Sequence, residues 1–157
     1  MKTKIIFSLL FLATLIGCKY EDGPLISFRT AYKRVIGSYQ AEAFQIDGQD
    51  AMQIWKDSVC DIGVIFYTQE EPLKSIINVG SSFGGLGGQF KLTNNNRKIS
   101  FYRIDGDSLY PGCGPFDRGK ESTWNILKLS NQRMWIETDF EGHDYLLKLK
   151  KTNDSSK

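Results

Sequence analysis

Residues 34–48 read RVIGSYQAEAFQIDG, a pattern that predicts a β-strand ending in a tight turn. Small or apolar residues occupy every second position from 35 to 43, which is the period of a half-buried strand. Phe44 and Ile46 continue the apolar series on the other parity, so we expect a bulge or register change between the two series. Asp47-Gly48 then accepts positive φ at both central positions of a hairpin turn. The stretch therefore predicts the first strand of an antiparallel sheet.

The rest of the chain predicts further short strands that alternate with turn-forming residues. The clearest turns are Asn94-Asn95-Asn96, Asp105-Gly106, Asn131-Gln132 and Glu141-Gly142. The expected strands are Met52–Trp55, Val59–Tyr67, Leu73–Val79, Ile99–Ile104, Trp124–Leu129, Met134–Thr138 and Tyr145–Leu149. Such short strands, with no long amphipathic helix among them, predict an all-β protein, either an antiparallel up-and-down barrel or a sandwich.

Two segments rich in glycine or proline are predicted as loops. Gly80–Gly88 lacks the G-K-[ST] ending of a phosphate-binding loop, so its functional role would be a mobile lid over a barrel mouth. Tyr110–Phe116 places two prolines and two glycines around a cysteine, which indicates a fixed turn. A structural role is favoured for this turn, and an aromatic recognition patch of Tyr110 and Phe116 is the alternative.

The amino terminus carries a short apolar run behind two lysines. Lys2 and Lys4 precede the apolar residues 5–16, and Leu15-Ile16-Gly17-Cys18 ends the run. This arrangement resembles the lipobox of bacterial lipoproteins, which has a basic region, an apolar region and a small residue before the cysteine. The run is shorter than the roughly 20 residues that a membrane-spanning helix needs. An ordinary signal peptide that ends near a cysteine is the alternative.

The resemblance implies that Cys18 is lipidated and becomes the first residue after cleavage. Residues 1–17 would then form a signal peptide, 18–33 a lipidated tether, 34–150 the barrel and 151–157 a disordered tail. The implied location is the cell envelope, as an outer-membrane lipoprotein that faces the periplasm or the cell surface. The membrane is thus an expected partner, held through the lipid anchor.

The charge of the chain argues against nucleic acid as a partner. The formal net charge of +2 comes from Lys2 and Lys4, so a chain cleaved before Cys18 is formally neutral. A neutral chain without a run of lysines or arginines lacks the field that nucleic-acid binding needs.

After lipidation of Cys18, the remaining cysteines are Cys60 and Cys113. Two thiols of one domain can be joined outside the cytoplasm, and a disulfide across this loop would contribute roughly 4 kcal/mol in the chain-entropy model. Two separate thiols are the alternative, because the sequence does not show whether the two Cα atoms come within about 7 Å of each other.

No combination of residues predicts catalysis, a metal or a cofactor. His143 lies in a predicted turn, and the chain has no G-x-S-x-G motif to supply a nucleophile beside it. Cys60, Cys113 and His143 lack the close spacing of zinc ligands. Acid pairs such as Asp57 with Asp61 lie at strand ends and turns, where structural acids are common. We therefore expect a protein that is not an enzyme and holds no metal or cofactor.

The first and last strands resemble those of lipocalin-like lipoproteins of bacterial envelopes. Val35-Ile36-Gly37-Ser38-Tyr39 is similar to a first strand in which a glycine, any residue and an aromatic follow one another, although Tyr39 replaces the usual tryptophan. Trp124-x-Ile126-x-x-Leu129, Met134-Trp135-Ile136 and Tyr145–Leu149 resemble the closing strands. The resemblance implies a closed antiparallel barrel of about eight strands. The best-known members of that family hold small apolar ligands.

Three functions remain open on this evidence. The first is binding of a small apolar or amphipathic ligand inside the barrel, since small-ligand sites are concave and mostly apolar. The residues expected to line that site are Tyr39, Phe66, Phe101 and Trp124. The second is an interaction module with a filled barrel, attached to a larger envelope complex through its outer surface, and a contiguous exposed apolar patch would favour it. The third, a small hydrolase or isomerase, has no catalytic residues to support it.

Overall fold

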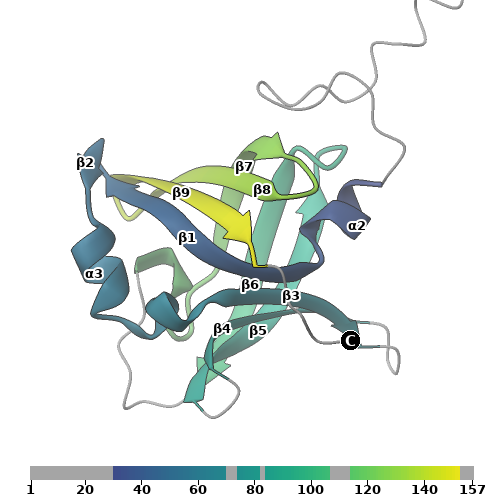
Figure 1. The fold of residues 1–157 in the computed structure, drawn as a ribbon, viewed down its shortest axis with the longest axis horizontal. Coiled ribbons are helices and arrows are strands. Elements are labelled where there is room, and N and C mark those ends of the chain that lie inside the picture. Colours follow the sequence, from purple (N-terminus) through teal and green to yellow (C-terminus); the bar gives the residue numbers. More distant parts are fainter. Residues whose placement is uncertain (1–29, 70–73, 82–83, 107–113, 153–157) are drawn as a thin grey trace, which may run out of the picture.

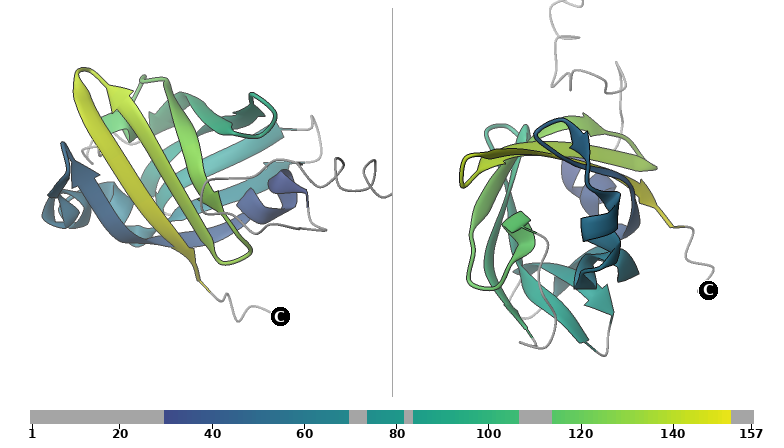
Figure 2. Two further views of the ribbon diagram at one scale, coloured as in Figure 1. Left: turned by 90° about the horizontal axis from the view of Figure 1, so that it is seen from above. Right: turned by 90° about the vertical axis from the view of Figure 1, so that its left-hand side faces the viewer.

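A computed structural model describes residues 30–69, 74–81, 84–106 and 114–152, and its strands form one antiparallel sheet that closes into a barrel (Figures 1 and 2). From β3 onward each strand pairs with the next, and β1 pairs with both β3 and β9. The bounds are β1 Gly37–Ile46, β2 Gln49–Asp50, β3 Val64–Gln69, β4 Lys74–Ser81, β5 Gly84–Thr93, β6 Lys98–Gly106, β7 Ser122–Leu129, β8 Arg133–Phe140 and β9 His143–Lys151. Since β2 only extends the turn after β1, eight strands make the wall, and the predicted all-β barrel is confirmed.

Short helices cover both ends of the barrel. One end, called here the α2 end, carries α2 (Ala31–Val35), the start of β1, the β5–β6 and β7–β8 turns and the end of β9. The opposite α3 end carries α3 (Met52–Lys56) and the 3-10 helices η1 (Val59–Ile62) and η2 (Gly114–Phe116). Figure 1 shows α2 and α3 on opposite sides, and the right-hand view of Figure 2 shows η2 within the ring of strands.

The pairing of β1 with β9 closes the barrel. It runs from Tyr39 opposite Lys151 to Ile46 opposite Tyr145, with a register shift between residues 41 and 43. This is the bulge that the change of parity in the sequence predicts. Because of it, Tyr39 and Phe44 are both buried in the core although they lie on opposite parities of one strand.

One apolar core lies inside the barrel and continues beneath the helices. Aliphatic side chains from the wall, such as Ile77, Ile99, Leu129 and Leu147, are fully buried. The core also contains eight aromatic residues, each exposed by 1% or less: Tyr39, Phe44, Trp55, Phe66, Phe90, Phe101, Phe116 and Trp124.

The predicted return strand at Met52–Trp55 is wrong, because these residues form helix α3. The Asp50 carboxylate accepts a hydrogen bond from the Met52 N–H at 3.0 Å, a local turn that satisfies the first N–H of the helix. Trp55 is buried against the core, whereas Ile54 is 55% exposed. The buried residues Ala51 and Trp55 are thus four positions apart, as on one face of a helix. Five residues are too few for the sequence to distinguish this spacing from the alternation of a strand.

Two further strand boundaries differ from the prediction. Helix α2 occupies residues expected to belong partly to the tether and partly to the first strand, and the Thr30 side chain caps it. The strand predicted from Val59 begins only at Val64, because η1 precedes it. The folded part therefore includes residues 30–33, and β9 extends to Lys151.

The loop predicted at Gly80–Gly88, and the lid considered as its function, are wrong for the residues that the structure describes, because Gly80 and Ser81 end β4 and pair with the start of β5. A Cβ at Gly85 would lie 2.4 Å from the Val79 carbonyl oxygen, so this position needs glycine for close backbone approach. The glycines therefore permit tight strand pairing. Residues 82 and 83 lie outside the described part.

The turn predictions have mixed outcomes. Asp47 and Gly48 both have positive φ, as do Glu141 and Gly142, and Asn94-Asn95-Asn96 forms a turn in the same region of φ. Asp105-Gly106 instead ends β6, so the turn predicted there is wrong. Glycine, asparagine and aspartate tolerate positive φ, so they identified the turns at which the backbone adopts that conformation.

Candidate functional site

The structure brings together the four aromatic residues expected to line a ligand site. Tyr39 meets Phe66 edge-on with ring centroids 5.6 Å apart, and Phe66 lies 6.1 Å from Phe101. Phe101 continues to Trp124 at 6.3 Å. These are ordinary contact distances between aromatic rings, so the four residues pack on one another.

Further rings, which the sequence did not place in this group, complete the cluster. Phe90 meets Phe66 at 5.3 Å, and Phe116 stacks on Trp124 at 5.3 Å. Trp55 lies edge-on to Phe116 at 6.2 Å and contacts Phe44 at 5.1 Å. Burial of Phe116 excludes it from the exposed recognition patch considered above, and Tyr110 lies outside the described residues. The structural role favoured for this segment is supported.

Polar contacts close the α2 end beneath Tyr39. The Tyr39 O–H donates to the Arg34 carbonyl oxygen at 2.7 Å, and Arg34 Nη1 donates to the Leu129 carbonyl oxygen at 3.1 Å. Lys151 Nζ donates to the Ile36 carbonyl oxygen and lies 5.4 Å from the centre of the Tyr39 ring. Burial raises the pKa of the Tyr39 phenol, which keeps it neutral and able to donate.

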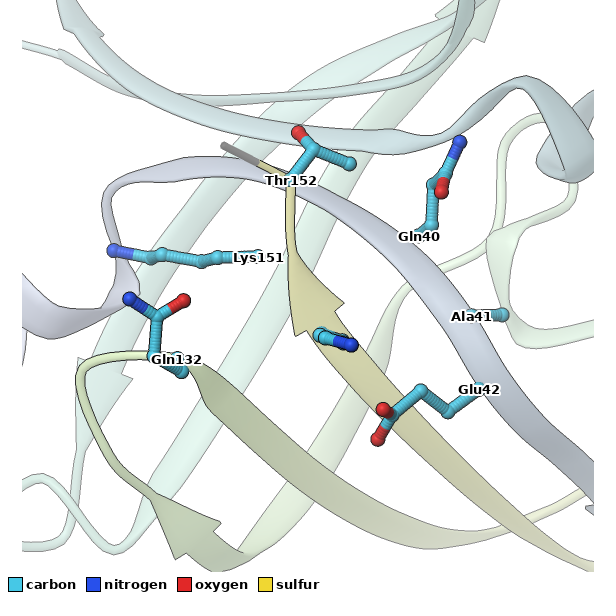
Figure 3. A pocket seen from close by; sticks show the side chains of 7 residues that line it. Gln40, Ala41, Glu42, Gln132, Lys151 and Thr152 are labelled. Carbon is cyan, nitrogen blue, oxygen red and sulfur yellow. The ribbon is translucent and has the colours of Figure 1, made fainter. Parts of the chain in front are cut away.

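A polar hollow of about 480 Å³ lies on the outer surface at the β1 bulge (Figure 3). In Figure 3 the side chains of Gln132 and Lys151 extend on one side of β9, while Gln40 and Glu42 lie along β1 on the other. The lining offers amide, ammonium, hydroxyl and carboxylate groups from Gln40, Ala41, Glu42, Gln132, Lys150, Lys151 and Thr152. These groups suit hydrogen bonds to a polar partner surface.

A second hollow, of about 360 Å³, lies beside α2. Tyr32 stacks on Phe90 with ring centroids 5.8 Å apart and forms a hydrogen bond through its hydroxyl to Ser75. The lining is mixed and consists of Tyr32, Ser75, Gln89, Phe90, Lys91, Leu92, Asn96 and Tyr102. This hollow reaches one member of the buried aromatic cluster from outside the barrel.

His143 is exposed and bridges two turns at the α3 end. Its Nδ1 lies 2.8 Å from Asp47 Oδ2, and the Asp144 N–H donates to Asp47 Oδ1 at 2.9 Å. The hydrogen bond and the attraction to Asp47 raise the pKa of His143. The hydrogen bond from His143, followed by the one from Asp144, lowers the pKa of Asp47. The geometry indicates a structural clamp between the β1–β2 and β8–β9 turns.

Cys60 is buried in η1 and is disulfide-bonded. Cys18 and Cys113 both lie outside the described residues, so the pairing of Cys60 with Cys113 stays a prediction. Its support is that Phe116 packs against Trp55, which brings η2 close to the segment that carries Cys60.

Among the described residues, no cluster of three His, Cys, Asp or Glu side chains is arranged to hold a metal ion. Within the same part of the chain, no helix is both long and apolar enough to cross a membrane.

Comparison with known proteins does not assign a family. No protein-family model matches the chain, and no curated protein matches it either.

Replacing Asp47 by asparagine should lower the pKa of His143 toward its ordinary value of 6.5, because the hydrogen bond to a charged acceptor is lost. A histidine pKa that folding raises stabilises the fold fully below 6.5, and that stability is lost as pH rises through the folded pKa. The Asp47 contribution is present above 3.8 and is lost as pH falls through its lowered pKa. An NMR titration of His143 checks this, and an unchanged midpoint in Asp47→Asn would contradict it.

The predicted Cys60–Cys113 disulfide should make both cysteines resist alkylation in folded, unreduced protein. Reduction should lower the melting temperature, since a cross-link of this loop length contributes roughly 4 kcal/mol in the chain-entropy model. Peptide mapping of the unreduced protein identifies the linked pair. Isolation of Cys60 joined to any other thiol would show the prediction to be wrong.

Proposed function

We propose that this protein is a lipid-anchored protein of the cell envelope that acts as an interaction module through its outer surface. The observation that carries this proposal is the filled aromatic cluster. The Phe66 ring contacts three other rings, and its centroid lies within 6.1 Å of the centroids of Tyr39, Phe90 and Phe101. A ligand between these rings would have to displace them, and large side chains in close-packed cores move only at a cost of kilocalories per mole.

The covered ends of the barrel add to this support. Tyr39 and Lys151 make the polar contacts at the α2 end, while Trp55 and Phe116 pack over the α3 end. The hollow at the β1 bulge lies on the outer face, where it offers polar groups to a partner. A protein of this kind needs no catalytic group, and the role that fits His143 is the turn clamp with Asp47.

Binding of a small amphipathic molecule is the second candidate. The observation that favours it is the hollow beside α2, where the aromatic rings of Tyr32 and Phe90 meet the polar side chains of Ser75 and Gln89. Such a mixture of apolar surface and a few polar groups is typical of small-molecule sites. In this case the ligand would sit at the edge of the barrel, and Phe90 would be the only member of the buried cluster to touch it.

The proposed anchor rests on the lipobox-like residues 15–18 and on the lysines that precede them. One lipid chain gives weak, reversible membrane binding, whereas two or more chains give stable attachment. The proposal includes an outer-membrane location, with the barrel in the periplasm or on the cell surface.

Cys18→Ala should abolish lipidation and release the protein from the membrane fraction, or leave its signal peptide uncleaved. The reason is that the Cys18 thiol is the proposed attachment atom. Fractionation and intact mass of the wild type and of Cys18→Ala check this, with Cys113→Ala as the control that keeps the lipid. Equal membrane fractions and an unmodified amino terminus in both would contradict the proposed anchor.

Phe66→Ala should create a cavity that binds benzene, whereas the wild-type barrel should not bind it. Removing this ring leaves an apolar void among Tyr39, Phe90 and Phe101, and engineered voids of this kind stay dry and take up small apolar molecules. The variant should also lose about 3–5 kcal/mol of unfolding free energy.

Saturation-transfer NMR on the mature chain without its lipid measures the binding. Phe140→Ala is the matched control, because Phe140 is only partly buried and contacts Tyr145 at the barrel edge. Benzene binding by the wild type as strong as by Phe66→Ala would sink the filled-barrel proposal.

A further inference from the structure

The charged side chains separate along the barrel axis. Acidic residues concentrate at the α3 end, on its turns, helices and strand ends. Among the described side chains they are Asp47, Asp50, Asp57, Asp61, Asp105, Asp117, Glu121, Asp139, Glu141 and Asp144. The cations described there are Lys56, Arg118 and Lys120, of which Arg118 pairs with Asp105 at 2.9 Å and Lys120 with Glu141. The α3 end is therefore acidic.

The α2 end and the adjoining half of the wall have the opposite charge. Their described and solvent-reachable cations are Lys33, Lys91, Arg97, Lys98, Lys128, Arg133, Lys148 and Lys150. The acids described on this part of the wall are Glu42, which pairs with Arg133 Nε at 3.2 Å, and Glu137, two residues from Trp135 on β8. Among the described side chains the two ends of the barrel therefore differ in charge, while Glu70 and Glu71, in the connection between β3 and β4, lie outside the described residues.

A basic strip with an aromatic centre runs across β7, β8 and β9. Trp135 pairs with Lys128 on one side and Lys148 on the other, and their ammonium groups lie 4.3 and 4.7 Å from its ring centre. Arg133 and Lys150 form the neighbouring pair toward the α2 end. The Trp135 indole N–H is buried and has no hydrogen-bond partner within the described part of the chain.

The chain enters the barrel at the same basic end. Thr30 precedes α2, and the segment from Cys18 to Thr30 spans at most roughly 40 Å when fully extended. A lipid at Cys18 would thus attach to the barrel through its α2 end.

We infer that the α2 end and the strip around Trp135 rest on an anionic lipid surface, with the acidic α3 end directed away from it. This inference depends on the proposed lipid anchor and goes beyond it by assigning an orientation and a second contact. Clustered lysines and arginines next to an anchor are attracted by negative headgroups within about a Debye length. Tryptophan is favoured at the headgroup level because its ring is apolar and its N–H is polar. The ligand class is the lipid phosphate group.

The test uses the full lipidated protein in vesicles of phosphatidylcholine alone or mixed with phosphatidylglycerol, each with a quencher attached to the headgroups. Trp55 and Trp124 are exposed by 1% or less, so added quenching reports Trp135, and Trp135→Phe confirms the source. Quenching should be about twofold greater on anionic vesicles, because the basic strip is drawn to the surface. Salt at about 1 M, where the Debye length is roughly 3 Å, should remove the difference.

Lys128→Gln with Lys148→Gln should also remove the difference. The matched control, Lys56→Gln with Lys120→Gln, removes the same charge at the α3 end and should keep it. Equal quenching on both vesicle types would overturn the inference and leave the strip to an acidic protein partner. Flotation of the vesicles tests the lipid anchor separately from the contact of the basic strip with lipid. Protein that fails to float lacks the anchor. Protein that floats but shows no quenching difference has the anchor and lacks the second contact.

Discussion

The pairing of β1 with β9 is the constraint on which the rest of the structure depends. These strands come from opposite ends of the folded chain, and their ladder from Tyr39–Lys151 to Ile46–Tyr145 removes the open edges that a sheet would otherwise expose. The bulge between Ala41 and Ala43 has a second consequence, because it leaves both Tyr39 and Phe44 in the core. Closure at so large a sequence separation costs chain entropy before it gains contacts, so we expect it to form late in folding.

Closure of the sheet into a barrel and packing of side chains inside it depend on each other. A ring of eight strands encloses a space that side chains or one small molecule can occupy. Here Phe66, Phe101, Phe116 and Trp124 form a continuous series of ring contacts from the wall to η2. The helices at the two ends are short, yet each buries a side chain in the core, Val35 from α2 and Trp55 from α3. On the proposal that the chain itself fills the interior, the outer wall and its charged side chains are the surfaces that serve recognition.

Local backbone preferences were predictable from the sequence, and distant contacts were not. Asp47-Gly48 and Glu141-Gly142 identified their turns because positive φ is a property of those residues themselves. The bulge was predictable because the apolar series changes parity within one strand. Helix α3 was not, since Met52 and Ile54 alternate like a strand and only the contacts of Trp55 with Phe44 and Phe116 distinguish the helix. Gly85 was mistaken for part of a lid, because its role is the close approach of Val79 from the neighbouring strand.

For the expected site residues, too, the sequence predicted the local arrangement but not the distant contacts. Tyr39, Phe66, Phe101 and Trp124 do lie together, as alternation on strands predicted, but alternation does not reveal whether facing rings leave a space. Phe116, which packs against these rings, comes from a segment whose glycines and prolines suggested a loop, and Phe90 was not among the residues expected at the site. The most direct measurement is native mass spectrometry of the protein isolated from its own envelope. A filled barrel predicts the mass of the lipidated chain with no retained small molecule, and a stoichiometric apolar ligand that stays bound would contradict it.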